Sequence, residues 1–169
     1  MPDDTIDLRT GPPLDQRLLA LLPLVGQWSG AGQWVVDGEP VAVGLALAFA
    51  HDGREFVTYE ARMWAPADGS APARPTGRES GFWRRGFHQD AVEAALADSA
   101  GAITVLTGVA GDARWELATD SVAASPTGRA VQAERRLYAV VRDSLMVITE
   151  QKLGEAWAPQ LTAQLTRVR

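Results

Sequence analysis

The chain of 169 residues contains no cysteine. This absence excludes a disulfide framework, a thiolate metal ligand and a thiol nucleophile. Histidine occurs only twice, at His51 and His88, so a zinc or non-haem iron site would have to draw on distant carboxylates. Neither histidine stands in a recognisable triad context with a serine. We therefore expect no catalytic residue and no metal site.

Long apolar runs are also missing. No run approaches the roughly 20 apolar residues of a membrane span, and the acidic N-terminus lacks the basic and apolar regions of a secretory signal. We expect a cytoplasmic protein that does not contact a membrane. The net charge of −5 disfavours nucleic-acid binding. The doublets Arg84-Arg85 and Arg135-Arg136 are therefore interpreted as solvated strand ends.

The length and the hydrophobic content of 46% suit one domain. We predict a flexible N-terminal segment over residues 1–13 and a single domain over residues 14–169. A short helix is expected from about residue 15 to 22, where leucines recur at helical spacing before Pro23, which ends the helix.

The period changes to two after the helix. Bulky residues at 41, 43, 45, 47 and 49 alternate with small ones, which is typical of a strand. The same reading predicts ten strands, near residues 26–35, 40–50, 54–64, 78–86, 90–97, 101–109, 113–120, 130–139, 145–152 and 160–168. Short turns such as Asp52-Gly53 join antiparallel neighbours. Residues 66–77, rich in Pro, Gly and Ala, are the one long loop, which we expect beside an opening.

Ten antiparallel strands either stack as a sandwich or close on themselves, and closure removes exposed edges. We favour an all-β fold, a ten-stranded antiparallel up-and-down β-barrel with a short N-terminal helix. Such a barrel has room for a cavity, so we expect a small apolar molecule as ligand. The six tryptophans either wall this cavity or pack the core, and packing is favoured for each.

Five glutamates fall in or beside the predicted strands, at Glu60, Glu79, Glu116, Glu134 and Glu150. Two of them converging in the lumen would offer an acid and a base. Solvated carboxylates on the outside of the barrel are the favoured interpretation.

A glycine motif follows the helix, with Gly26, Trp28, Gly30 and Gly32 in a Gly-x-Trp-x-Gly-x-Gly pattern. A dinucleotide-binding loop requires the opposite order, a strand before the glycines and a helix after them. Glycines within a strand permit bends and close backbone approach, as where a helix packs or a flat ligand lies against a barrel wall. We therefore place these four residues at a pocket wall.

This motif and four later segments resemble the nitrobindin family over nearly the whole chain. The segments are Phe49 to Tyr59, Glu79 to Arg84, Val92 to Gly101 and Leu161 to Val168. The resemblance implies a barrel related to the fatty-acid-binding proteins. In some members, the wide end of this barrel holds haem b through one proximal His on the last strand.

The chain departs from the family at the haem side. Gln160 stands where the family has its iron-ligating His, Gly77 stands at the second pocket His, and the family's Tyr-Pro-Thr-Ile stretch is absent around residues 34–37. A carboxamide is a weak donor for haem iron. Strand parity groups Gln160 with Thr162, Gln164 and Thr166 on a polar face.

Two functional hypotheses follow from these departures. The first is a barrel that takes no cofactor and binds another small apolar molecule. The alternative is a haem b protein that isomerises peroxynitrite and binds nitric oxide through a substitute axial ligand. The residues weighed for that role are two histidines expected in solvated turns and four residues expected in the core: His51, His88, Tyr59, Tyr138, Met63 and Met146. The sequence also leaves a homodimer open.

Overall fold

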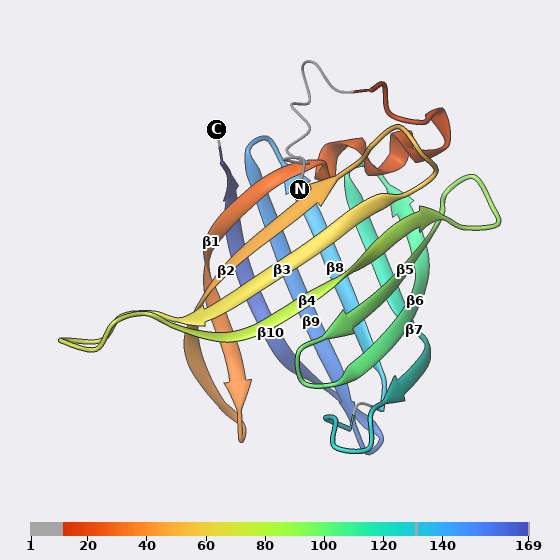
Figure 1. The fold of residues 1–169 in the computed structure, drawn as a ribbon. Helices are drawn as coiled ribbons and strands as arrows, with labels where there is room; N and C mark the ends of the chain where they lie inside the picture. Colours follow the sequence, from red (N-terminus) through yellow and green to blue (C-terminus); the bar gives the residue numbers. More distant parts are fainter. Residues whose placement is uncertain (1–11, 131, 169) are drawn as a thin grey trace.

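The computed structural model describes residues 12–130 and 132–168. In this part of the chain, one short 3-10 helix precedes ten strands (Figure 1). Their bounds are η1 Gln16–Leu24, β1 Gly26–Val36, β2 Glu39–Ala50, β3 Val57–Ala65, β4 Arg74–Arg85, β5 Ala91–Asp98, β6 Ala102–Gly111, β7 Arg114–Ala124, β8 Glu134–Val141, β9 Ser144–Leu153 and β10 Ala156–Arg167. Residues 1–11, most of the predicted flexible segment, lie outside the described residues.

The ten strands form one closed barrel in which each strand pairs with its neighbours in sequence. β1 closes the ring by pairing antiparallel with β10, from Trp28 opposite Arg167 to Trp34 opposite Leu161. The predicted up-and-down barrel is therefore confirmed. The long loop is shorter than predicted, because β4 begins at Arg74 and pairs there with Ala65. No helix among residues 12–130 and 132–168 is long and apolar enough to cross a membrane.

The helix closes one end of the barrel (Figure 1). Three residues of the helix itself, Leu18, Leu21 and Leu24, are buried. The indole N–H of Trp28 donates to the Leu24 carbonyl at 2.8 Å, and that of Trp115 donates to the Ala20 carbonyl at 3.0 Å. Because both indoles are buried, these bonds satisfy N–H groups that would otherwise be unpaired, and they fix the helix over the lumen.

Aromatic side chains fill the lumen below the helix. Phe49, Tyr59, Trp83 and Tyr138 are all buried. The Phe49 ring lies 5.1 Å from Tyr59 and 5.6 Å from Trp83, and Trp83 lies 5.1 Å from Tyr138 in an edge-to-face arrangement. These are favourable ring geometries. Any cavity must therefore lie at the other end of the barrel.

The glycines of β1 allow β10 to approach closely. A Cβ at Gly30 would lie 2.2 Å from the Gln164 carbonyl oxygen, and one at Gly32 would lie 2.3 Å from that of Thr162. Both atoms belong to the backbone of β10, so neither contact can be relieved by a rotamer change. The seam that closes the barrel therefore requires glycine at these two positions.

We predict that Gly30→Ala destabilises the barrel by about 1–3 kcal/mol, because β10 must shift to admit the methyl group. Gly111→Ala is the matched control, since a Cβ there meets nothing within 4 Å. Urea unfolding curves measure both variants. Equal midpoints for Gly30→Ala and the wild type would show that the β1–β10 seam is not tightly packed.

Candidate functional site

A cavity of about 440 Å³ occupies the end of the barrel opposite the helix. One side is apolar and formed by β1, β2, β9 and β10, with Trp34, Leu45, Leu47, Val147 and Leu161. No residue of β6 or β7 lines it. The expected ligand-sized cavity is therefore present, but it fills only one side of the lumen.

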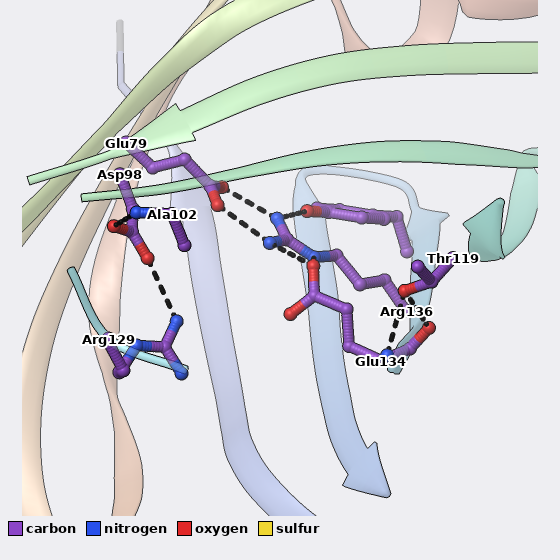
Figure 2. A network of polar contacts seen from close by, with 8 residues as sticks. Glu79, Asp98, Ala102, Thr119, Arg129, Glu134 and Arg136 are labelled. Atoms are coloured by element: carbon purple, nitrogen blue, oxygen red, sulfur yellow. Dashed lines mark hydrogen bonds and ion pairs between the residues drawn. The ribbon is translucent and has the colours of Figure 1, made fainter. Parts of the chain in front are cut away.

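The opposite side of the cavity is ionic, because Arg136 on β8 reaches across the lumen to Glu79 on β4 (Figure 2). Its two terminal nitrogens donate to the two Glu79 oxygens at 2.6 and 2.7 Å. The same guanidinium donates through Nε to Glu134 Oε1 at 2.9 Å, and its Nη2 forms an ion pair with that oxygen at 2.6 Å. This cross-barrel cluster of Glu79, Glu134 and Arg136 separates the cavity from β6 and β7.

The cross-barrel cluster is buried and tied to the surrounding strands. The side chains of Arg136 and Glu134 are only 8% and 3% exposed. The Glu134 backbone N–H donates to the Thr119 hydroxyl at 2.8 Å, and that hydroxyl donates to the Glu134 carbonyl at 3.0 Å. A charged group in such a place requires pairing. We therefore expect the cluster to be rigid.

The two tyrosines form the inner limit of the cavity, where the aromatic side chains begin. Burial is the main cause that raises the pKa of Tyr59 and Tyr138 above 10.0. The negative charge of Glu79 contributes in the same direction. Both phenols are therefore neutral near neutral pH, and a neutral phenol is a poor iron ligand.

Asp98 and Arg129 form a second polar group at the mouth of the cavity (Figure 2). The Asp98 carboxylate accepts from the backbone N–H groups of Ala102 and Ala100 and from Arg129, each at 2.9 Å. Burial alone would raise the pKa of Asp98, but these three donors outweigh it and lower the pKa. The bond to Arg129 attaches the segment between β7 and β8 to the turn between β5 and β6.

Gln160 does not line the cavity. The register shifts between Pro159 and Leu161, which makes Gln160 the extra residue of a bulge in β10. Its half-buried side chain donates to the Val35 carbonyl at 3.1 Å. Its neighbours at 162, 164 and 166 are exposed to solvent, as one polar strand face. The bulge takes the Gln160 side chain out of the alternation that residues 162, 164 and 166 follow. Strand alternation in the sequence did not indicate this.

Gly77 lines the cavity opposite Met63. A Cβ there would meet only the Met63 methyl group, at 3.5 Å, so the position has room for a side chain. Trp34, in the region where the family stretch is absent, also lines the cavity. None of Gly26, Trp28, Gly30 and Gly32 does so.

The substitute ligands fall in different places. Tyr59, Tyr138 and Met63 line the cavity, whereas Met146 is 39% exposed. His88 is exposed, as expected. The expectation of a solvated His51 is wrong, since it is 6% exposed at the closed end of the barrel. A Cβ at Gly53, in the same loop, would lie 3.1 Å from Pro12 and 3.4 Å from Pro13, so these prolines lie close to that loop.

Two further expectations need correction. Glu79 and Glu134 do converge in the lumen, while Glu60, Glu116 and Glu150 pair with arginines on the outside. The partner that brings the two together is Arg136, which is buried and not a solvated strand end. Strand alternation with the inward Tyr138 was the signal available for Arg136. Among the tryptophans only Trp34 lines the cavity, in agreement with the packing interpretation for the others.

Comparisons with known proteins agree on one family. The description "THAP4-like, heme-binding beta-barrel domain" matches residues 17–167. The chain is 38% identical to "Peroxynitrite isomerase 2" of Mycolicibacterium vanbaalenii, over 99% of this chain and 84% of that protein. It is 39% identical to "Ferric nitrobindin-like protein" of Corynebacterium glutamicum strain R, over 99% and 75%. The crystal structure of Rv2717c from M. tuberculosis superposes with a TM-score of 0.81 at 30% identity, covering 93% of this chain and all of that one.

The expectation of a barrel without a cofactor is therefore wrong. It rested on the three departures at Gln160, Gly77 and residues 34–37, whereas the family match and the peroxynitrite isomerase relatives point to haem. The apolar side of the cavity and the arginines at its mouth suit a porphyrin and its carboxylates. The donor set fits less well, because no imidazole lines the cavity. Among the described residues, no group of three or more His, Cys, Asp or Glu could hold a metal ion.

We predict that Arg136→Met costs about 3–5 kcal/mol of stability, because it leaves the buried Glu134 carboxylate and the half-buried Glu79 carboxylate without their cation. Arg135→Met is the matched control on the same strand, where the guanidinium pairs with Glu150 on the outer surface and the effect should be far smaller. Denaturant midpoints compare the two. A similar loss in both variants would contradict a special role for the cross-barrel cluster.

The chain's two tyrosines should resist alkali. The unfolded chain releases phenol protons near pH 10, while the folded barrel retains them because burial raises the pKa of both groups. The free energy of unfolding is therefore unaffected by these groups below pH 10. Above pH 10 it falls by up to about 1.4 kcal/mol per pH unit for each tyrosine. Tyrosinate absorbance should rise together with the loss of circular dichroism. A separate earlier rise would contradict burial.

Proposed function

Because the chain belongs to the family of THAP4-like, heme-binding beta-barrel domains, we propose that its cavity binds a haem-class tetrapyrrole and retains the ring through its walls. The observation that supports this is a cavity of about 440 Å³ with a broad apolar side and arginines at its mouth. Retention then comes from burial of apolar ring surface rather than from an iron–imidazole bond.

The apolar side of the cavity would contact the flat ring. Leu45, Leu47 and Leu161 bring branched aliphatic surface from two strands, β2 and β10, and Trp34 on β1 adds an aromatic surface near the mouth. A well-shaped apolar cavity of this kind is the usual form of a cofactor site. These walls orient the ring and exclude water from its faces.

The mouth of the cavity would receive the acidic groups of the ligand. Arg74 and Arg129 line it there. Arg129 is held by Asp98, and Arg74 makes no ion pair with any residue in the described ranges. Guanidinium groups are suited to carboxylates. When bound, ferric haem would supply an iron centre, and this chain offers that centre no imidazole.

We predict that the wild-type protein binds both haemin and metal-free protoporphyrin, with affinities within about tenfold, which is 1.4 kcal/mol. Gly77→His, at a cavity-lining position with room for a side chain, should tighten haemin by more than tenfold and leave protoporphyrin unchanged, because only haemin has an iron to ligate. Soret absorbance and porphyrin fluorescence measure the two. Wild-type binding of haemin without any binding of protoporphyrin would mean that iron, and not the walls, holds the ligand.

A further inference from the structure

The cross-barrel cluster carries a net negative charge into the cavity. Glu79 and Glu134 bring two carboxylates, and Arg136 brings one guanidinium. All three line the same cavity. Because the cluster is largely withheld from solvent, its charge is weakly screened and acts strongly on whatever occupies the space beside it.

The guanidinium has no donor left for a ligand. Its Nε hydrogen goes to Glu134, its Nη2 is shared between Glu79 and Glu134, and its Nη1 donates to Glu79 and, at 3.5 Å, to the Tyr138 hydroxyl. An arginine has five N–H donors, and these contacts use them. A bound anion would therefore find carboxylates on this side of the cavity and no available N–H from Arg136.

One acceptor in the cluster stays open. The hydrogen bond and the ion pair from Arg136 both reach Glu134 Oε1. Among the residues drawn in Figure 2, none contacts Oε2. The side chain that carries it is 3% exposed and lines the cavity. A donor or cation in the cavity beside this oxygen would form a charge-assisted hydrogen bond with the carboxylate.

We propose that the cavity selects apolar ligands that present a cationic or N–H-donating group to Glu134. Nitrogen bases with an apolar body form this class, and so does a flat ring whose centre carries positive charge. This inference rests on the proposed function only in taking the cavity as the ligand site. It adds that the ionic side of the cavity, from β4 and β8, sets the preferred charge of the ligand.

Three probes of equal chain length and different head groups test the proposal: n-decylamine, n-decanol and n-decanoate, below their micellar concentrations. Isothermal titration calorimetry of the wild type at neutral pH should rank the ammonium first, with affinity at least about tenfold above that of decanoate. The alcohol should lie between them. The advantage of the amine should be retained at high salt, because the cluster is buried.

Glu134→Gln should bring the three affinities to within about twofold. Its amide oxygen still accepts from Arg136, and only the charge and the open Oε2 are lost. Glu150→Gln is the matched control, since it removes the same charge on the neighbouring strand but from the outer surface. It should preserve the ranking. Circular dichroism and unfolding curves establish that both variants are folded.

The outcomes separate the two proposals. If decanol binds and the wild type does not distinguish amine from carboxylate, the inference is wrong and the cavity remains a ligand site. If decanoate binds most tightly, the arginines at the mouth dominate and the inference is also wrong. If none of the three binds, the inference is wrong, and the haemin and protoporphyrin titrations decide the proposed function separately. Should Glu134→Gln not fold, the wild-type ranking alone decides.

Discussion

The width of a closed ten-stranded barrel is the constraint on which the rest of this structure depends. Eight strands already enclose room for one small ligand, and two more widen the interior further. The chain fills this space in layers: the helix with its leucines, the four aromatic rings, and finally the cross-barrel cluster beside an open cavity. The cavity is therefore what remains after one end and one side have been packed.

Closure itself depends on residues that touch no ligand. Gly30 and Gly32 let β10 lie against β1, and Arg167 near the end of β10 donates to the carbonyls of Pro23 and Val25 while stacking on Trp28 at 4.1 Å. This arrangement joins the last strand to the helix exit. The glycine motif thus allows β1 and β10 to pair and close the barrel, whereas its sequence pattern suggested a direct role in ligand binding.

The fold was predictable because period-two alternation and turn residues act locally, and both are visible in a single chain. β2 shows this most clearly, with Val43, Leu45, Leu47 and Phe49 all buried. The site was less predictable because it depends on contacts between distant strands. Nothing near Arg136 in the sequence indicates that its partner Glu79 lies 57 residues earlier. Beside Gln160 the one signal is Pro159, because a proline in a paired strand occurs at the start of the strand or at a bulge. Parity could have marked Arg136 as inward, but not its partners.

The two sides of the cavity place opposite demands on a ligand. The apolar side stabilises any ligand that buries apolar surface, whatever its charge. The ionic side favours ligands of one charge sign over the other. No His in the described part of the chain lines the cavity, so the forces of the two sides act on a ligand without a directional bond from an imidazole. Under the proposed ligand preference, selectivity in this barrel follows Glu134 and its neighbours on β4 and β8.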